Sequence, residues 1–251
     1  MKVKLLLWLG VVFLSISTVY GQTSNFRDEQ RKFSRVKVAY SEKTDWVTEL
    51  LADNNLDRSK LELFVRVFKE ERVLEVWGRS GNIPYKKLNE YAFCSFSGDL
   101  GPKRAEGDFQ IPEGIYHINH FNPFSNFYLS MGINYPNKSD RLLGKKGAPG
   151  SNIYIHGGCA TIGCIPITDD KIKELYLLAV EARHSGQQNI PVHIFPTRLD
   201  EEGIERLSGK YTDSNLIVFW KSLQPLYLSF EETFYLPKVR INSDGSYQLV
   251  E

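Results

Sequence analysis

Hydrophobic side chains change their spacing twice along the chain and so divide it into three parts. In the first part, residues 22–58, apolar side chains recur at helical spacing in two groups: Phe33, Val36 and Tyr40, then Val47, Leu50 and Leu51. This pattern predicts two short amphipathic helices that cap another part of the fold. We expect the second helix to end at Asn54 and Asn55.

In the second part the spacing changes to two, which is typical of strands. The alternation begins with two interleaved sets, which are Leu61, Leu63, Val65 and Val67 and then Glu62, Phe64, Arg66 and Phe68. A turn at Glu70 and Glu71 and an apolar run over residues 73–77 complete a predicted β-hairpin. Further strands are predicted between loops rich in Gly, Pro, Asn and Ser, at residues 88–96, 114–119, 127–131 and 152–156.

The third part begins after Cys164, where helical spacing returns. Thr168 is suited to cap a helix that Gly186 ends, with apolar positions at Ile172, Leu175, Leu178 and Ala179. Residues 190–195 then predict a strand and residues 215–230 a helix that Pro225 kinks or breaks. An Asp244–Gly245 turn follows. The simplest organisation is one β-rich domain of the α+β class with helical additions at both ends.

Composition and charge agree with a globular protein and narrow the choice of partners. The chain has 251 residues, of which 42% are hydrophobic, and its formal net charge is +1. These values exclude a disordered, collagen-like or coiled-coil chain. They also leave no large basic field for nucleic acid or an anionic membrane. We expect a partner that is recognised by shape and local chemistry.

The N-terminus has the pattern of a secretory signal over residues 1–21. A basic start is followed by an apolar stretch over residues 5–16 and by small or polar residues up to Gly21. The alternative is a membrane anchor, but a spanning helix needs about 20 apolar residues. In an oxidising compartment, the odd number of cysteines implies one disulfide and one free thiol, or three free thiols.

One short segment combines the residue types that thiol chemistry needs. His156 ends a predicted strand, and Cys164 follows eight residues later at the start of the next predicted helix. An imidazole takes a proton from a thiol, and a helix N-terminus favours the resulting anion. Gly163 removes a side chain that would crowd a substrate, and the amides of Gly163 and Cys164 are candidates to face an oxyanion. The pattern suits acyl transfer through a thioester.

Two other interpretations of this segment stay open at the level of the residues alone. His156 is also compatible with a hydrogen-bonded strand end of no catalytic role. His156, Cys159 and Cys164 are also possible zinc ligands, although the chain has no Cys-x-x-Cys pair. The remaining histidines show no helical His-x-x-x-His pairing: His117, His120, His184 and His193.

Two separated motifs resemble a known family. Ile155-His156-Gly157, followed by Thr161-Ile-Gly-Cys164, resembles the catalytic signature of the L,D-transpeptidase (YkuD-like) family of bacterial cell-wall enzymes. Residues 98–116 resemble the YafK-like murein transpeptidase branch of that family, and the likeness extends over about residues 60–197. The resemblance implies an L,D-transpeptidase-type β-sandwich catalytic domain at residues 59–197. Residues 1–21 would then be the signal peptide, 22–58 a helical N-terminal segment and 198–251 a helical C-terminal extension.

The resemblance also implies roles for individual residues. Cys164 would be the acylated nucleophile and His156 its base, with the Gly157 carbonyl orienting the imidazole. Gly163 and Thr161 would support the oxyanion. No metal or other cofactor is implied. Ile162 stands where the family usually has histidine, and Pro166 where many members have Arg or Asn.

Other residues follow from the same resemblance. If Cys164 stays a thiol, Cys94 and Cys159 are the candidate disulfide, and two buried free cysteines are the alternative. Candidates to contact a peptide stem are Lys103, Arg104 and Tyr154, together with Glu106 and Asp108, and a solvated loop surface is the other interpretation. The aromatic residues 121–128 form either a lid or core packing, and the turn at residues 112–114 is expected to be structural.

The function implied is a secreted murein L,D-transpeptidase-like cysteine acyltransferase in the periplasm or cell wall. It would act on peptidoglycan peptide stems in cell-wall biogenesis or remodelling, including cell shape. A second stem or a wall-linked protein would be the acceptor. The alternatives are a hydrolytic variant, which is an L,D-carboxypeptidase or an amidase that releases wall-linked protein, and a non-catalytic wall-binding protein. No nucleic acid partner is expected, nor a stable membrane span after signal removal.

Overall fold

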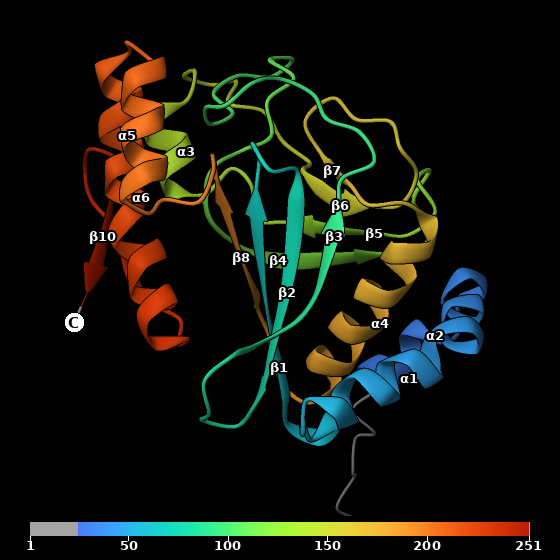
Figure 1. Cartoon of the computed structure of the whole chain (residues 1–251). Coiled ribbons are helices and arrows are strands. Elements are labelled where there is room, and N and C mark those ends of the chain that lie inside the picture. The colour runs from blue at the N-terminus through green and yellow to red at the C-terminus, as the bar shows by residue number, and fades with distance from the viewer. Residues whose placement is uncertain (1–24, 251) are drawn as a thin grey trace, which may run out of the picture.

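The computed structural model describes residues 25–250, so the predicted signal peptide lies outside the described residues. Most strands form one sheet of eight in the order β3-β2-β1-β8-β4-β5-β6-β7. The strands are β1 (Leu61–Phe68), β2 (Val73–Ser80), β3 (Lys86–Ala92), β4 (Gly114–Asn122), β5 (Ser130–Ile133), β6 (Tyr154–His156), β7 (Ile165–Pro166) and β8 (Ile190–Phe195). Figure 1 shows the sheet curled, with β4, β5 and β6 crossing the direction of β1 and β2. The predicted β-rich α+β class is confirmed.

The predicted hairpin forms the centre of the fold. β1 pairs antiparallel with β2 from Leu61 and Ser80 to Phe68 and Val73, and it also pairs parallel with β8. Apart from the partly exposed Glu62, both sets of alternating side chains on β1 are buried, because helices cover both faces of the sheet (Figure 1). Val65 and Val67 join the core cluster shared with α2 and α4, whereas Phe64 packs against Phe230 of the C-terminal segment.

The N-terminal segment differs from the prediction. It consists of a short helix α1 (Phe26–Gln30) and one helix of 20 residues, α2 (Ser34–Asp53), where two short helices were predicted. The two apolar groups lie on one face in the same helical phase, and no Gly or Pro separates them. The predicted end of the second helix is confirmed, because Asn54 is the C-cap of α2 and Asn55 has a positive φ of 56°.

The helix after Cys164 is confirmed, with one correction that bears on the thiol. α4 (Asp169–His184) has Thr168 as its N-cap and ends just before Ser185 and Gly186. β7 lies between Cys164 and α4, so Cys164 is not at the start of that helix. The prediction that a helix N-terminus stabilises the Cys164 thiolate is therefore wrong, because this effect is confined to the first turn of a helix and Cys164 lies before β7.

The C-terminal segment packs on the other face of the sheet (Figure 1). It contains the predicted helix, α6 (Ser214–Thr233), which continues through Pro225, and an unpredicted helix, α5 (Glu201–Lys210). A two-stranded sheet of β9 (Lys238–Ile241) and β10 (Tyr247–Val250) encloses the Asp244–Gly245 turn. The remaining short elements are α3 (Lys138–Leu143) and the 3-10 helix η1 (Arg58–Lys60). Among residues 25–250, no helix is long and apolar enough to cross a membrane.

A buried ion pair ties this C-terminal segment to the sheet. The side chains of Lys69 and Glu113 are fully buried, and Nζ lies 2.9 Å from Oε1. Trp220 of α6 donates to the other carboxylate oxygen at 2.7 Å, and the Gly101 amide donates to Oε1 at 2.7 Å. Lys69 also donates to the carbonyls of Gly101 and Ile111. The turn at residues 112–114 is therefore structural, as expected.

Candidate active site

Strand register brings His156 and Cys164 to the same face of the sheet. β6 and β7 run parallel, with Ile155 opposite Ile165 and His156 opposite Pro166. By the same register, Cys164 lies one residue before this pairing, beside Tyr154. Alternate residues of a strand face the same side. Both side chains consequently line one cavity of about 200 Å³, together with Asn122, Ser125, Asn126, Phe127, Ser130 and Tyr154.

His156 is buried and has one free ring nitrogen. Its Nδ1 is hydrogen-bonded to the carbonyl of Gly157, which fixes Nδ1 as the protonated nitrogen because a carbonyl only accepts. The ring stacks on Phe127 with centroids 4.5 Å apart. Nε2 is buried and has no hydrogen-bond partner among the described residues. Burial lowers the pKa of the imidazole, and the bond to Gly157 opposes that effect. The result is a neutral imidazole with a free acceptor, as a general base requires.

Cys164 is the free thiol of the described chain, and it is half-buried. Its Sγ lies 3.9 Å from the carbonyl oxygen of Asn152. Burial raises the pKa of the thiol, while the Tyr154 backbone amide and the charge of Lys103 act in the opposite direction. A thiol with a raised pKa needs a base before it attacks a carbonyl, and the free Nε2 of His156 in the same cavity is suited to that task.

Thr161 holds the loop before Cys164. The Thr161 hydroxyl accepts from the amides of Cys164 at 2.8 Å and Gly163 at 3.2 Å, and it donates to the Cys164 carbonyl at 2.8 Å. Both amides that were predicted to face an oxyanion thus already have an acceptor. Gly163 has φ of +130°, and a Cβ there would lie 2.8 Å from the Gln110 carbonyl oxygen. Any larger residue at position 163 would therefore collide with the loop that carries Gln110, whether or not a substrate is bound.

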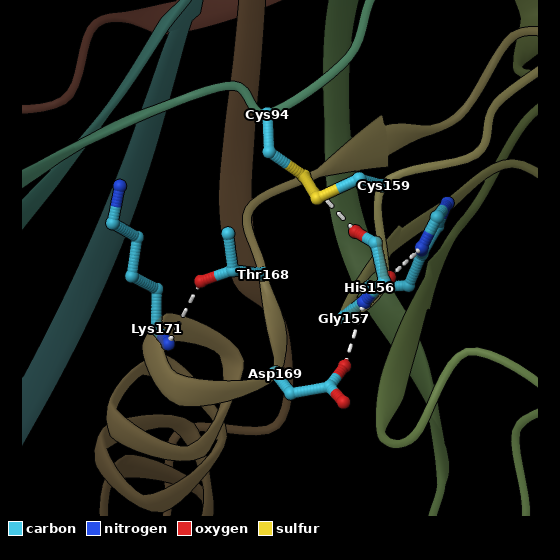
Figure 2. Close-up of a disulfide and its surroundings, with 8 residues drawn as sticks. Cys94, His156, Gly157, Cys159, Thr168, Asp169 and Lys171 are labelled. Atoms are coloured by element: carbon cyan, nitrogen blue, oxygen red, sulfur yellow. Dashed lines mark hydrogen bonds between the residues drawn. A yellow bond between two sulfur atoms is a disulfide. The ribbon is translucent and has the colours of Figure 1, made fainter.

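Figure 2 shows a disulfide between Cys94 and Cys159, next to the segment that carries His156. The two cysteines are 65 residues apart in sequence, and their Cα atoms are 5.3 Å apart. Zinc binding by His156, Cys159 and Cys164 is incompatible with this bond, because metals bind the thiolate. Within residues 25–250 no cluster of His, Cys, Asp or Glu is arranged to hold a metal ion.

Alkylation of the native, unreduced protein is expected to label one cysteine, Cys164, because a disulfide sulfur has no thiolate to react. Intact-mass analysis should show one adduct before reduction and three after reduction in denaturant. A Cys164→Ser variant is the matched control and should show none before reduction. Three adducts on freshly prepared, unreduced wild type would contradict the disulfide.

The predicted substrate-loop residues divide into two groups. Lys103 lines a second cavity of about 230 Å³ that Cys164 also borders, but its Nζ is already bonded to Asp108 at 2.7 Å and to the Ala105 carbonyl at 2.9 Å. Tyr154 borders the cavity of His156. Arg104 lies elsewhere: its guanidinium is 3.6 Å from Asp140 and covers the ring of Phe219. The prediction of a substrate contact by Arg104 is therefore not supported by its position.

The aromatic stretch at residues 121–128 packs partly on the core, one of its two predicted roles, and also contacts His156. Phe121 and Tyr128 pack against the core, whereas Phe127 stacks on His156. Arg35 of α2 holds this loop by donating to the carbonyls of Ser125 and, at 2.6 Å, Tyr128. Ser130, which pairs with His156 across β5 and β6, carried no signal in the sequence.

Comparison with known proteins identifies the class of this chain. The L,D-transpeptidase catalytic domain (YkuD) matches residues 63–194, which include His156 and Cys164. The chain belongs to this family. "Putative L,D-transpeptidase YafK" of Escherichia coli, strains K12 and O157:H7, is 37% identical over 181 residues, which are 71% of this chain and 70% of the relative.

Two solved structures show more distant likeness. The helical cell shape determining protein Pgp2 of Campylobacter jejuni is 17% identical, with 80% of each chain covered and a TM-score of 0.44. L,D-transpeptidase 1 of Mycobacterium tuberculosis is 15% identical, with 53% of this chain and 62% of that chain covered and a TM-score of 0.31.

Proposed function

We propose that this protein is a secreted cysteine acyltransferase that acts on peptidoglycan peptide stems in cell-wall biogenesis or remodelling. The observation that carries the proposal is the shared cavity of Cys164, a free thiol, and His156, a neutral imidazole with an unpartnered Nε2. Family membership supplies the reaction class, because the family is described as an L,D-transpeptidase catalytic domain. The 37% identical relative carries the same activity in its name.

In the first half-reaction, His156 Nε2 takes the proton of Cys164, and the thiolate attacks the carbonyl that follows the L-centre of the third stem residue. A bond from Sγ to the carbonyl carbon forms, and the amide bond to the terminal D-amino acid breaks. The imidazolium returns its proton to the leaving amine. The product is a thioester on Cys164 and a free D-amino acid. An oxyanion at the amides of Gly163 and Cys164 would replace the Thr161 hydroxyl as the acceptor of their hydrogen bonds.

In the second half-reaction an amine attacks the thioester, His156 removes its proton and Cys164 leaves as a thiol. Two cavities border Cys164, one beside His156 and one beside Lys103 and Ile162, and they give room for a donor and an acceptor chain. If water attacks instead, the same site is a carboxypeptidase or an amidase. Exclusion of water from the cavity would decide between transfer and hydrolysis.

Two features support secretion to the periplasm or cell wall. Residues 1–21 carry a secretory pattern, and the Cys94–Cys159 disulfide is of the kind that persists in oxidising compartments. An oxidising compartment suits a substrate in the cell wall.

Cys164→Ala is expected to reduce product formation from tetrapeptide muropeptides by at least about a thousandfold, since removal of a nucleophile leaves binding alone. Wild type should gain the mass of the acyl stem and release the terminal D-amino acid. Crosslinked dimers among the products indicate transfer, and tripeptide stems indicate hydrolysis. The double variant Cys94→Ala/Cys159→Ala is a control that keeps the nucleophile. Equal product from wild type and Cys164→Ala would reject the enzyme and leave a wall-binding protein.

A further inference from the structure

The hydrogen bond that orients His156 involves a peptide group with a second partner. The carbonyl of Gly157 accepts from His156 Nδ1. The amide of the same peptide group belongs to Gly158, and it donates to Oδ1 of Asp169 at 2.7 Å. Figure 2 shows Asp169, the first residue of α4, pointing at this segment from the side opposite His156. A carboxylate, a peptide group and an imidazole are thus connected in series.

We propose that Asp169 is a positioning residue for His156 and acts through the Gly157–Gly158 peptide group. The inference rests on the proposed role of His156 as the base. The hydrogen bond from Gly158 to Asp169 sets the orientation of the peptide group. The Gly157 carbonyl then orients the His156 ring, so that Nε2 faces the cavity that it shares with Cys164. A carboxylate that accepts from the amide N–H also draws electron density onto the carbonyl oxygen, because hydrogen bonds in a chain polarise one another. The carbonyl then stabilises the imidazolium that forms when His156 takes the thiol proton.

The glycines make this arrangement possible. A Cβ on Gly157 would lie 2.5 Å from Asp169 Oδ1 and 2.8 Å from the Phe127 carbonyl oxygen, so any larger residue would push the carboxylate away. Gly158 has φ of +63°, a conformation that glycine adopts without strain. The segment is also held from the other side by the disulfide of the next residue, Cys159, and the Gly158 carbonyl oxygen lies 3.0 Å from Cys94 Sγ. This contact is not a hydrogen bond, because a disulfide sulfur carries no proton.

The next residue, Asp170, offers a matched comparison. Both aspartates lie in the first turn of α4, and both are exposed, so their interactions with the helix dipole are similar. The carboxylate of Asp170 instead pairs with Lys43 at 2.8 Å and Lys173 at 3.5 Å. Asp169 alone of the two contacts the peptide behind His156. Because Asp169 is exposed, replacing it should not leave a hole in the core.

The other charged and titratable groups near this series lie on two sides, one beside His156 and one beside Asp169. His156 is stacked on Phe127 and shares its cavity with the Cys164 thiol and Tyr154. On the Asp169 side lies Tyr128, whose pKa is raised chiefly by burial; Lys173 and Arg35 lower it, and Glu42 and Asp169 raise it. Because the Gly157–Gly158 peptide group is bonded to both His156 and Asp169, loss of the Asp169 charge is expected to reach His156 through this group.

The test compares Asp169→Asn, Asp169→Ala and Asp170→Asn by NMR titration of the His156 imidazole, alongside stem acylation. Asn keeps an acceptor for Gly158 and loses the charge, whereas Ala loses both. We expect the imidazole pKa to fall by several tenths of a unit in Asp169→Asn and further in Asp169→Ala. Acylation should slow about threefold and about tenfold, in the same order. Asp170→Asn should match wild type in both measurements.

An imidazole pKa in Asp169→Asn equal to that of wild type would overturn the proposal, whatever the activity. A merely structural Asp169 would lower the melting temperature and leave the titration unchanged. The titration needs no substrate, so its result stands apart from the proposed function. If wild type transferred no acyl group, the proposed function would fail while the coupling of Asp169 to His156 could still be measured.

Discussion

Replacing His156 with Gln is expected to slow stem acylation by about 10²–10⁴-fold, the range that a general base contributes. Cys164 would then have no base in its cavity, and its raised pKa keeps it protonated at neutral pH. Gln retains a polar side chain of similar length, so loss of packing on Phe127 is limited. Single-turnover acylation followed by intact mass measures the effect. His184→Gln, in the last turn of α4, is the control and should match wild type.

The pH dependence sharpens this prediction. In wild type, acylation should fall at acid pH because the protonated imidazole accepts no proton. Burial lowers the pKa of His156, so this limb should lie below the ordinary value of 6.5. In His156→Gln this limb should be replaced by one at higher pH, where the rate rises as the Cys164 thiolate forms. An acid limb that persists unchanged in the variant would show that another group is the base.

Glu113→Ala is expected to lower the free energy of unfolding by about 3–5 kcal/mol, the cost of breaking a buried ion pair by removing one partner. Burial already lowers the pKa of Lys69, and Glu113 is the carboxylate that opposes this effect most. The variant would also leave the Trp220 indole and the Gly101 amide without their acceptor. Urea unfolding followed by circular dichroism measures the change.

Two further variants make this result interpretable. Glu70→Ala removes an exposed partner of Arg206 next to Lys69 in sequence and should cost less than about 1 kcal/mol. Lys69→Met/Glu113→Leu replaces both charges with apolar side chains and should recover part of the loss, because no unpaired ion remains. A Glu113→Ala variant as stable as Glu70→Ala would mean that the pair contributes little.

Elements with a strong local pattern could be predicted from the sequence. The central hairpin, α4 and β8 each combine regular spacing with clear ends, and the structure confirms them. α5 was missed because only three of its residues are buried, one of them Gly203, so its apolar pattern is sparse. A division of α2 was predicted because its two apolar groups are separated by polar residues, although they share one face. The spacing of β1 could not show that both of its faces are covered.

Site residues could likewise be predicted only where a local sequence pattern carries them. His156 and Cys164 were found because they lie eight residues apart within one segment of recognisable composition. Ser130 and Asp169 were missed as site residues because strand pairing and loop packing, rather than sequence spacing, bring them to His156. Phe127 was included only in a stretch with two possible roles, and its stacking on His156 was not predicted. Lys103 and Arg104 are adjacent, yet one borders the second cavity and the other lies against Asp140. A charge pattern alone does not tell which neighbour faces the cavity.

The loop at residues 121–128, whose Phe127 stacks on His156, is held by a residue outside the segment that matches the family. Arg35 of α2 donates to two carbonyls of that loop, and the family match begins only at residue 63. Trp220 of α6 likewise lies beyond the last matched residue, 194, and supports Glu113 within the match. A chain cut at the limits of the match would keep every atom of the thiol–imidazole pair and lose both of these supports. A fragment made for activity measurements should accordingly extend beyond residues 63–194 at both ends, to include Arg35 and Trp220.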